Sequence, residues 1–221
     1  MPSIYRSVFD IIGPIMVGPS SSHTAGAVAI GKAARVIFQD MPTKVTVHYY
    51  ESFAKTHRGH GTDFAIAAGI MGFSPDDKRV PKAPQLAKMA GIDIRYVEEE
   101  GPSPIHHPNT AILEMVNGDH QTTVGGCSVG GGAIEIRLIK AQHVELTPTG
   151  PLPIVLYLDR DKNLRHVEAL KQQLIFGNGL KKEQKKQAQS GDLYEFDMLE
   201  SLSPEKIAKL EKKYKGIVFL K

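Results

Sequence analysis

Hydrophobic spacing changes several times along the first two thirds of the chain. Apolar residues recur at helical intervals after His23 and on to Phe38, and shorter helices are predicted at Gly61–Gly72 and Ala83–Gly91. Residues Thr43–Phe53 instead alternate between apolar and polar side chains, which is typical of a half-buried strand. Helices and strands mix in this region, and we therefore predict an α+β fold.

Strand patterns dominate the next part of the sequence. β-like stretches follow one another at Ile92–Glu99, Thr110–Gly118 and Gly132–Lys140. The triplet Asn-Gly-Asp at Asn117–Asp119 is a strong signal for a hairpin turn. The three glycines Gly130–Gly132 indicate a bulge, a close backbone approach or a flexible turn, and the sequence leaves these possibilities open.

A domain boundary is predicted near the stretch Thr147–Pro153. This stretch is rich in proline and glycine, so regular backbone pairing is hard to sustain there. We expect a first domain over residues 1–147, a linker over 148–153 and a second domain over 154–221.

The second domain has a regular order of expected elements. A strand, a helix and a strand are followed by a helix that begins with Ser203 as its cap and Pro204 in its first turn, and then by a closing strand. This order suits a small ferredoxin-like module in which one strand is poorly defined. The missing strand is expected near Leu174–Leu180 or within the basic run Leu180–Gln189.

Composition narrows the class of protein. The 221 residues are 41% hydrophobic and 23% charged, which is ordinary for a globular protein. No apolar run approaches the roughly 20 residues of a membrane helix, and Met1–Ser22 lacks the pattern of a secretory signal. We therefore expect a cytoplasmic protein with no membrane partner. The net charge of +3 owes much to the basic run, which contains no aromatic residue and is typical of a solvated face, so we expect no nucleic-acid partner.

Several hydroxyl groups precede the first helix. Ser20, Ser21, Ser22 and Thr24 surround His23, whereas a helix cap needs only one hydroxyl oxygen. The surplus suggests a site for a carboxylate or phosphate, because hydroxyls and helix-terminal amides hold anions without a fixed charge. An ordinary cap in a polar loop is the alternative.

Two histidines and an aspartate lie in the stretch Lys55–Asp63, which we expect to be a loop between a strand and a helix. Imidazole titrates near neutral pH, so His60, oriented by Asp63, is a candidate base. Alternatively, Asp63 or Thr62 caps the next helix while His57 and His60 are merely exposed. A metal site formed by His57, His60 and Asp63 is disfavoured, because the intervening glycine interrupts a helical face.

Four motifs in order carry a resemblance to a known family. They are Tyr5–Ala27, which contains the serines, Gly59–Asp63, His107–Thr110 and Ser128–Gly132. From residue 4 to about 140 the chain resembles the beta chain of bacterial iron–sulfur-dependent L-serine dehydratase of the two-chain type. The tail resembles the family's ACT-type regulatory domain more loosely, because it lacks a glycine in the turn after its first strand and has the basic run in place of a middle strand pair.

The resemblance implies a lyase subunit that takes part in converting L-serine to pyruvate and ammonia. It implies a first domain similar in fold to the anion-binding domain of some 3-phosphoglycerate dehydrogenases, followed by a diverged ACT-like, ferredoxin-like domain. It also implies a 4Fe-4S cluster whose ligands come from a partner alpha chain, since Cys127 is the only cysteine and supplies at most one thiolate. No metal ligand is expected on this chain.

By the same resemblance, two groups of residues are expected in the site. The catalytic candidates are His60, Asp63 and His23, and the candidates for binding L-serine are Ser20, Ser21, Ser22, Thr24, Asn109 and Thr110. Self-association of the beta domain is also expected. Two alternatives stay open: a purely regulatory module that binds an anion or serine, and a stand-alone metal-dependent hydrolase that uses His57, His60 and Asp63.

Overall fold

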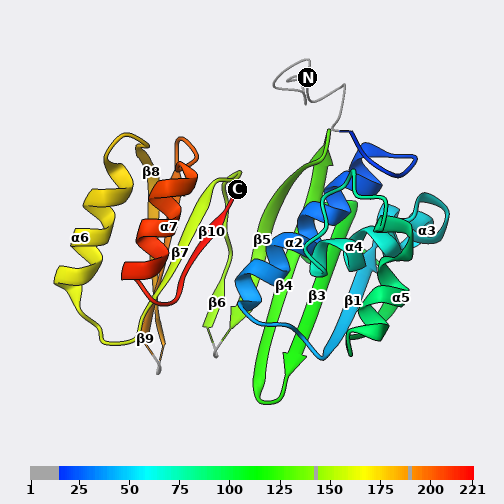
Figure 1. The fold of residues 1–221 in the computed structure, drawn as a ribbon, viewed down its shortest axis with the longest axis horizontal. Coiled ribbons are helices and arrows are strands. Elements are labelled where there is room, and N and C mark those ends of the chain that lie inside the picture. Colours follow the sequence, from blue (N-terminus) through cyan, green and yellow to red (C-terminus); the bar gives the residue numbers. More distant parts are fainter. Residues whose placement is uncertain (1–14, 142–143, 189–190) are drawn as a thin grey trace. The chain divides into compact units, whose positions relative to one another are not determined.

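The computed structural model describes residues 15–141, 144–188 and 191–221. The chain divides into two compact units, of which the first ends at Ile139 and the second begins at Lys140 (Figure 1). Most of the stretch in which we expect no secretory signal lies outside the described residues. Within the described ranges, no helix is both long and apolar enough to cross a membrane.

The strands of the first unit, β1 to β4 and β5 as far as Ile139, belong to a mixed sheet with strand order β2-β1-β3-β4-β5-β6. β1 pairs in parallel with β2 and antiparallel with β3, and β3 pairs antiparallel with β4. The strands are β1 (Lys44–Tyr50), β2 (Asp93–Glu98), β3 (Asn109–Asn117), β4 (His120–Gly130), β5 (Ala133–Ala141) and β6 (Val144–Leu146). The division between the two units falls within β5.

Helices α2 and α4 lie together over this sheet (Figure 1). Gly31 of α2 and Gly69 of α4 let the two backbones approach, because a side chain at Gly31 would meet the Ile66 carbonyl and one at Gly69 would meet the Val28 carbonyl. The helical segments are η1 (Ser21–Ala25), α2 (Gly26–Phe38), α3 (Glu51–His60), α4 (Thr62–Ile70), η2 (Val80–Lys82) and α5 (Ala83–Met89). The small residues of α2 therefore serve close packing.

Helix α3 is the main departure from the predicted elements. The strand expected over Thr43–Phe53 ends at Tyr50, and the stretch expected to be a loop is helical up to His60. Glu51 turns the chain with a φ of 47°. Only Phe53 and His57 of α3 are buried, so the sequence shows no apolar stripe that would indicate a helix.

The turns fit the sequence more closely. Asn117–Asp119 joins β3 to β4, as predicted, and Gly118 has a φ of 56°. Gly130, Gly131 and Gly132 have φ values of 108°, 59° and 87° and connect β4 to β5. Of the three alternatives for these glycines, the structure shows a turn that requires left-handed backbone.

The second unit has the element order βαββαβ and an antiparallel sheet ordered β10-β7-β9-β8. This is the ferredoxin-like arrangement. Its elements are β7 (Ile154–Asp159), α6 (Leu164–Ile175), β8 (Leu180–Ala188), β9 (Gly191–Met198), α7 (Pro204–Lys213) and β10 (Ile217–Leu220). Helices α6 and α7 cover one face of the sheet (Figure 1), and their core includes Leu170, Phe196 and Tyr214. The α+β class is thus confirmed.

The basic run contains the strand that the sequence left undefined. It forms β8, which pairs with β9, so the expectation that the run replaces a middle strand pair is wrong. Because β8 is an edge strand and its lysines are exposed, the run shows no apolar alternation. The predicted start of α7 is confirmed, since the Lys206 amide donates to Ser203 Oγ at 3.3 Å. The linker over 148–153 stays a prediction.

Candidate active site

The hydroxyl-rich stretch forms η1 and leads directly into α2. The His23 amide donates to Ser20 Oγ at 3.3 Å, so Ser20 is the side-chain cap and Ser21 begins the first turn. Ser20 Oγ and Ser22 Oγ also lie 3.2 Å and 3.1 Å from His23 Nδ1. Two hydroxyls therefore lie within hydrogen-bond distance of the same imidazole nitrogen, whereas a cap requires only one hydroxyl bonded to a backbone amide.

His23 is buried, with 8% of its surface exposed. Its Nε2 lies 3.5 Å from Ser52 Oγ of α3, and its ring meets the His60 ring edge-on, with 4.8 Å between centroids. Burial, together with the neighbouring His60, lowers the pKa of His23 below its ordinary value. A neutral imidazole at neutral pH can accept a proton, so His23 has the state that a general base needs.

His60 ends α3 and closes this cluster. Thr24 Oγ1 donates to the His60 carbonyl at 3.4 Å, which ties the end of α3 to η1. His60 Nδ1 is buried and has no hydrogen-bond partner among the described residues. A buried polar atom without a partner needs an explanation, and a bound substrate group would supply one.

Asp63 does not orient His60, contrary to the sequence-based expectation. Its Oδ1 lies 2.7 Å from His57 Nδ1, and His57 is 3% exposed instead of lying at the surface. Gly61, with a φ of 72°, reverses the chain between α3 and α4, so the carboxylate three residues after His60 meets His57 instead. Sequence spacing could not show this reversal.

The alternatives for this segment also fail. Gly61 is the N-cap residue of α4, and neither Thr62 nor Asp63 forms a side-chain cap there. Within the described part of the chain, no group of three or more histidine, cysteine, aspartate or glutamate side chains is placed to hold a metal ion. The geometry therefore gives no support to a metal triad of His57, His60 and Asp63.

Asn109 and Thr110 occupy different surroundings. Asn109 Nδ2 donates to the Ser128 carbonyl at 3.4 Å. Thr110 is fully buried; it donates to the His107 carbonyl at 2.6 Å and lies 2.9 Å from the Ser103 hydroxyl. These bonds engage Thr110 within the fold, so its proposed contact with substrate finds no support in this geometry.

Two serines near the cluster were not among the candidates. Ser52 contacts His23, and its amide donates to the Pro108 carbonyl at 2.9 Å, which places the Asn109 segment against the start of α3. Ser128 Oγ is buried without a partner among the described residues, and it lies where a side chain at Gly26 would be. Ser128 belongs to the motif Ser128–Gly132, so the sequence offered a signal for it. Nothing in the sequence pattern marks Ser52.

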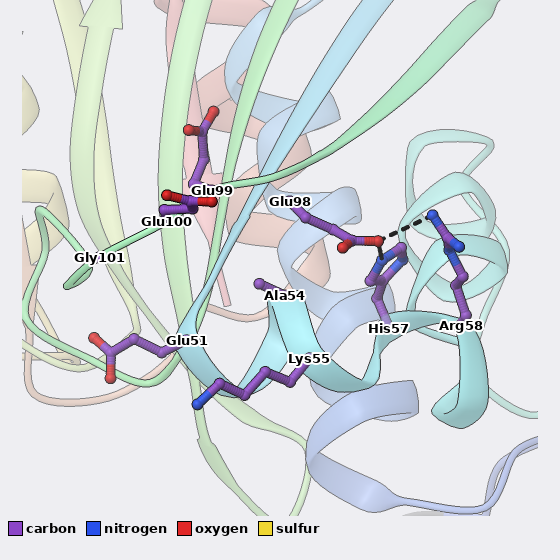
Figure 2. Close-up of a pocket in the computed structure, with 9 residues that line it drawn as sticks. All are labelled: Glu51, Ala54, Lys55, His57, Arg58, Glu98, Glu99, Glu100 and Gly101. Carbon is purple, nitrogen blue, oxygen red and sulfur yellow. Dashed lines mark hydrogen bonds and ion pairs between the residues drawn. The ribbon is translucent and has the colours of Figure 1, made fainter.

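A separate cavity of about 730 Å³ opens on the other part of α3 (Figure 2). Its walls are α3 and the segment that follows β2. They are lined by Glu51, Ala54, Lys55, His57, Arg58, Glu98, Glu99, Glu100 and Gly101. None of the residues expected to be catalytic or to bind substrate lies in this lining.

A buried imidazole with a lowered pKa, bonded by hydroxyls and beside a second imidazole, is an arrangement capable of acid–base chemistry. Comparison with known proteins gives the family of the chain. The family described as "Serine dehydratase beta chain" matches residues 7–137, a stretch that contains His23, His60 and their neighbours. The chain therefore belongs to the serine dehydratase beta chain family.

Individual relatives give the same result. The chain is 46% identical over 156 residues to the probable L-serine dehydratase, beta chain, of Bacillus subtilis, a match that covers 71% of this chain and 70% of that one. It is 42% identical over 142 residues to the L-serine dehydratase, beta chain, of Peptoniphilus asaccharolyticus, covering 63% of each. L-serine dehydratase 2 of Escherichia coli is 36% identical over 108 residues, which are 46% of this chain and 23% of that protein.

Proposed function

We propose that this chain is the beta subunit of an L-serine dehydratase and that, with an alpha chain, it converts L-serine to pyruvate and ammonia. The observation that carries the proposal is the cluster of His23, His60 and the serine hydroxyls, which lies within the stretch that matches the family. Loss of water from serine needs a base for the α-proton and groups that hold the carboxylate, and the cluster offers both kinds.

The residues divide these tasks by their chemistry. His23 and His60 are the candidates for moving the α-proton, since His23 is held neutral and His60 Nδ1 is buried with no partner in the described part of the chain. Ser20 and Ser22 supply hydroxyls that can donate to the substrate carboxylate. Ser21 and Thr24 neighbour them in η1 and belong to the proposed binding group, for which Asn109 also stays a candidate.

The residues of this chain do not fit a 4Fe-4S cluster. Such a cluster is held by several cysteine thiolates, and Cys127 is the only cysteine. Cys127 is fully buried in β4, and burial raises the pKa of its thiol to about 11, which disfavours the thiolate that a metal needs. The cluster that the family resemblance implies would therefore take its ligands from the alpha chain.

The second unit is proposed to be a diverged ACT-like regulatory domain. Its ferredoxin-like arrangement supports the fold, but the turn from β7 to α6, Arg160–Asn163, contains no glycine. The beta domain is also proposed to associate with a second copy.

Co-expression tests the function directly. The chain is produced anaerobically with and without a cysteine-bearing alpha chain, and pyruvate formation from L-serine is measured. Activity is expected only in the assembled enzyme, and the isolated chain is expected to contain no iron–sulfur absorbance. Stoichiometric iron–sulfur absorbance in the isolated chain would refute the proposed division of labour.

The variant His60→Ala separates a catalytic from a regulatory subunit. Loss of a general acid or base costs about 10²–10⁴-fold in rate, so turnover in the assembled enzyme is expected to fall at least about a hundredfold. If turnover at saturating L-serine stays near normal and only the apparent affinity changes, the chain is a regulatory module that binds serine or another anion.

A further inference from the structure

His57 makes an unusual pair of contacts for a buried histidine. Its Nδ1 lies 2.7 Å from Asp63 Oδ1 and its Nε2 lies 2.8 Å from Glu98 Oε1. Ionised carboxylates only accept hydrogen bonds, so the His57 ring bridges two acceptors, one at each of its nitrogens. His57, followed by the nearby Arg58, lowers the pKa of Glu98, which keeps that partner ionised.

The contacts join three elements that are separate in the sequence. His57 belongs to α3, Asp63 to the first turn of α4 and Glu98 to the end of β2. Figure 2 shows one oxygen of the Glu98 carboxylate joined to both His57 and Arg58, and Arg58 Nη2 lies 3.0 Å from Glu98 Oε1. The bridge is further enclosed by Tyr49, whose ring centroid lies 4.9 Å from that of His57.

Few side chains of helix α3 are buried against the rest of the first unit. Phe53 and His57 are its only buried residues, and it has no side-chain cap at its N-terminus within the described residues. It is a short, polar helix that contains Gly59, so its own helical propensity is weak. The bridge at His57 is therefore one of the contacts that set the position of α3, together with Phe53, the bond from the Ser52 amide to the Pro108 carbonyl and the bond from Thr24 to the His60 carbonyl.

The position of α3 determines where His60 lies. It lies three residues after His57, on the same side of the helix. Its ring nitrogen Nδ1 has no partner among the described residues, so the backbone of α3 decides where the ring lies. A shift of α3 would move His60 relative to His23.

We propose that His57, by bridging Asp63 and Glu98, is a positioning residue that holds α3 so that His60 faces His23 in the site. The inference rests on the proposed function for its catalytic consequence, but the bridge and its effect on His60 are properties of this chain alone. It gives Asp63 a part in the site through His57 and not through a bond to His60.

The test uses His57→Gln in the assembled enzyme. Glutamine is neutral and cannot donate to both carboxylates in the same way, so the bridge is lost while the size of the side chain is roughly kept. Because small misplacements of a reacting group cost up to about a hundredfold in rate, kcat for L-serine is expected to fall about 10- to 100-fold, with KM changed less than about threefold. Glu98→Gln, at a half-exposed position, is expected to give a smaller fall in kcat, and it covers the case in which His57→Gln folds poorly.

A matched control and a double variant make the test specific. His48 of β1 also bonds a glutamate, with Nδ1 2.6 Å from Glu99 Oε1, but it does not belong to α3. His48→Gln is expected to keep the wild-type kcat. In a His60→Ala background, His57→Gln is expected to cost nothing further, because it acts through His60.

A second readout does not depend on activity. In histidine side-chain NMR spectra of the full chain, His57→Gln is expected to shift the His60 ring signals while His48→Gln leaves them in place. Unshifted His60 signals, a wild-type kcat in His57→Gln, or a full additional loss in the double variant would overturn the positioning role. If the wild-type assembly does not act on L-serine, the proposed function fails, and the NMR comparison still decides whether the bridge positions His60.

Discussion

The two units of the chain bury charge in opposite ways. In the first unit, the buried His57 is placed between two carboxylates that come from different elements. In the second unit, Glu195 and Asp197 lie on the same face of β9, 1% and 3% exposed, and Glu195 Oε2 and Asp197 Oδ1 have no hydrogen-bond partner among the described residues. In the first cluster the carboxylates share a histidine as hydrogen-bond partner, whereas the second cluster brings two carboxyl groups together.

In the second cluster, the surroundings favour a proton on Glu195. Burial and the neighbouring Asp197 raise the pKa of Glu195 to about 7. Burial disfavours the charged form of a carboxyl group, and a second carboxyl group beside it adds to this effect. The comparison teaches that the first cluster depends on which side chains are present, whereas the second depends on pH.

The largest effect on stability is expected when the cluster of His57, Asp63 and Glu98 loses a carboxylate. Asp63→Ala leaves the buried His57 with one carboxylate, and removing one member of a buried ion pair costs about 3–5 kcal/mol. Asp63 is partly exposed, so a loss near the lower end, about 3 kcal/mol, is expected in the free energy of unfolding. Urea denaturation measures it, with the exposed Asp93→Ala as control. An unchanged midpoint for Asp63→Ala would show that the bridge does not stabilise the first unit.

Removing a carboxylate from the pair Glu195 and Asp197 is expected to change stability in the opposite direction. The folded-state pKa of Glu195, about 7, lies above its ordinary value of 4.5, so the folded state binds more protons between these pH values and stability falls as pH rises. Glu195→Gln removes this fall. At about pH 8 the variant is expected to be more stable by roughly 3 kcal/mol, and near pH 4 the difference should vanish.

Hydrogen exchange of β9 peptides resolves this change within the second unit. Glu200→Gln, at an exposed position after β9, is the control and should show no such dependence on pH. If Glu195→Gln has the same pH profile as the wild type, or is less stable than the wild type at about pH 8, then Glu195 is not held protonated by its surroundings.

The same contrast explains what the sequence could predict. Elements with a clear apolar period, such as α2, β3 and β7, appear close to where the pattern placed them. Helix α3 was missed, and strand β8 was expected only at one of two possible places, because both elements are mostly polar. Few side chains of α3 are buried, and β8 is an edge strand. Local periodicity reports burial, and these two elements bury little.

Partners across space were harder to predict than the residues themselves. The motifs pointed to His23, His60 and Asp63, and the structure brings the first two together. Asp63 instead pairs with His57, and Glu98, which completes the bridge, is 41 residues from His57 in the sequence. Such a contact follows from the pairing of β1 with β2, which no local pattern shows.

The smallest effect concerns two helix caps, one in each unit. Ser20 accepts from the His23 amide and Ser203 accepts from the Lys206 amide, both at 3.3 Å. Loss of such a cap costs about 1 kcal/mol, so Ser20→Ala and Ser203→Ala are expected to lower the free energy of unfolding by similar amounts. Thermal denaturation measures this loss in each variant.

Activity should then separate the two caps. Ser20 Oγ also lies 3.2 Å from His23 Nδ1, whereas Ser203 belongs to the other unit. Ser20→Ala is therefore expected to weaken turnover of L-serine in the assembled enzyme, and Ser203→Ala to leave it unchanged. A lost cap alone lowers stability and does not act on the substrate. Equal activity in both variants would therefore mean that Ser20 only caps η1. The proposed anion-binding group would then depend on Ser22 and its neighbours.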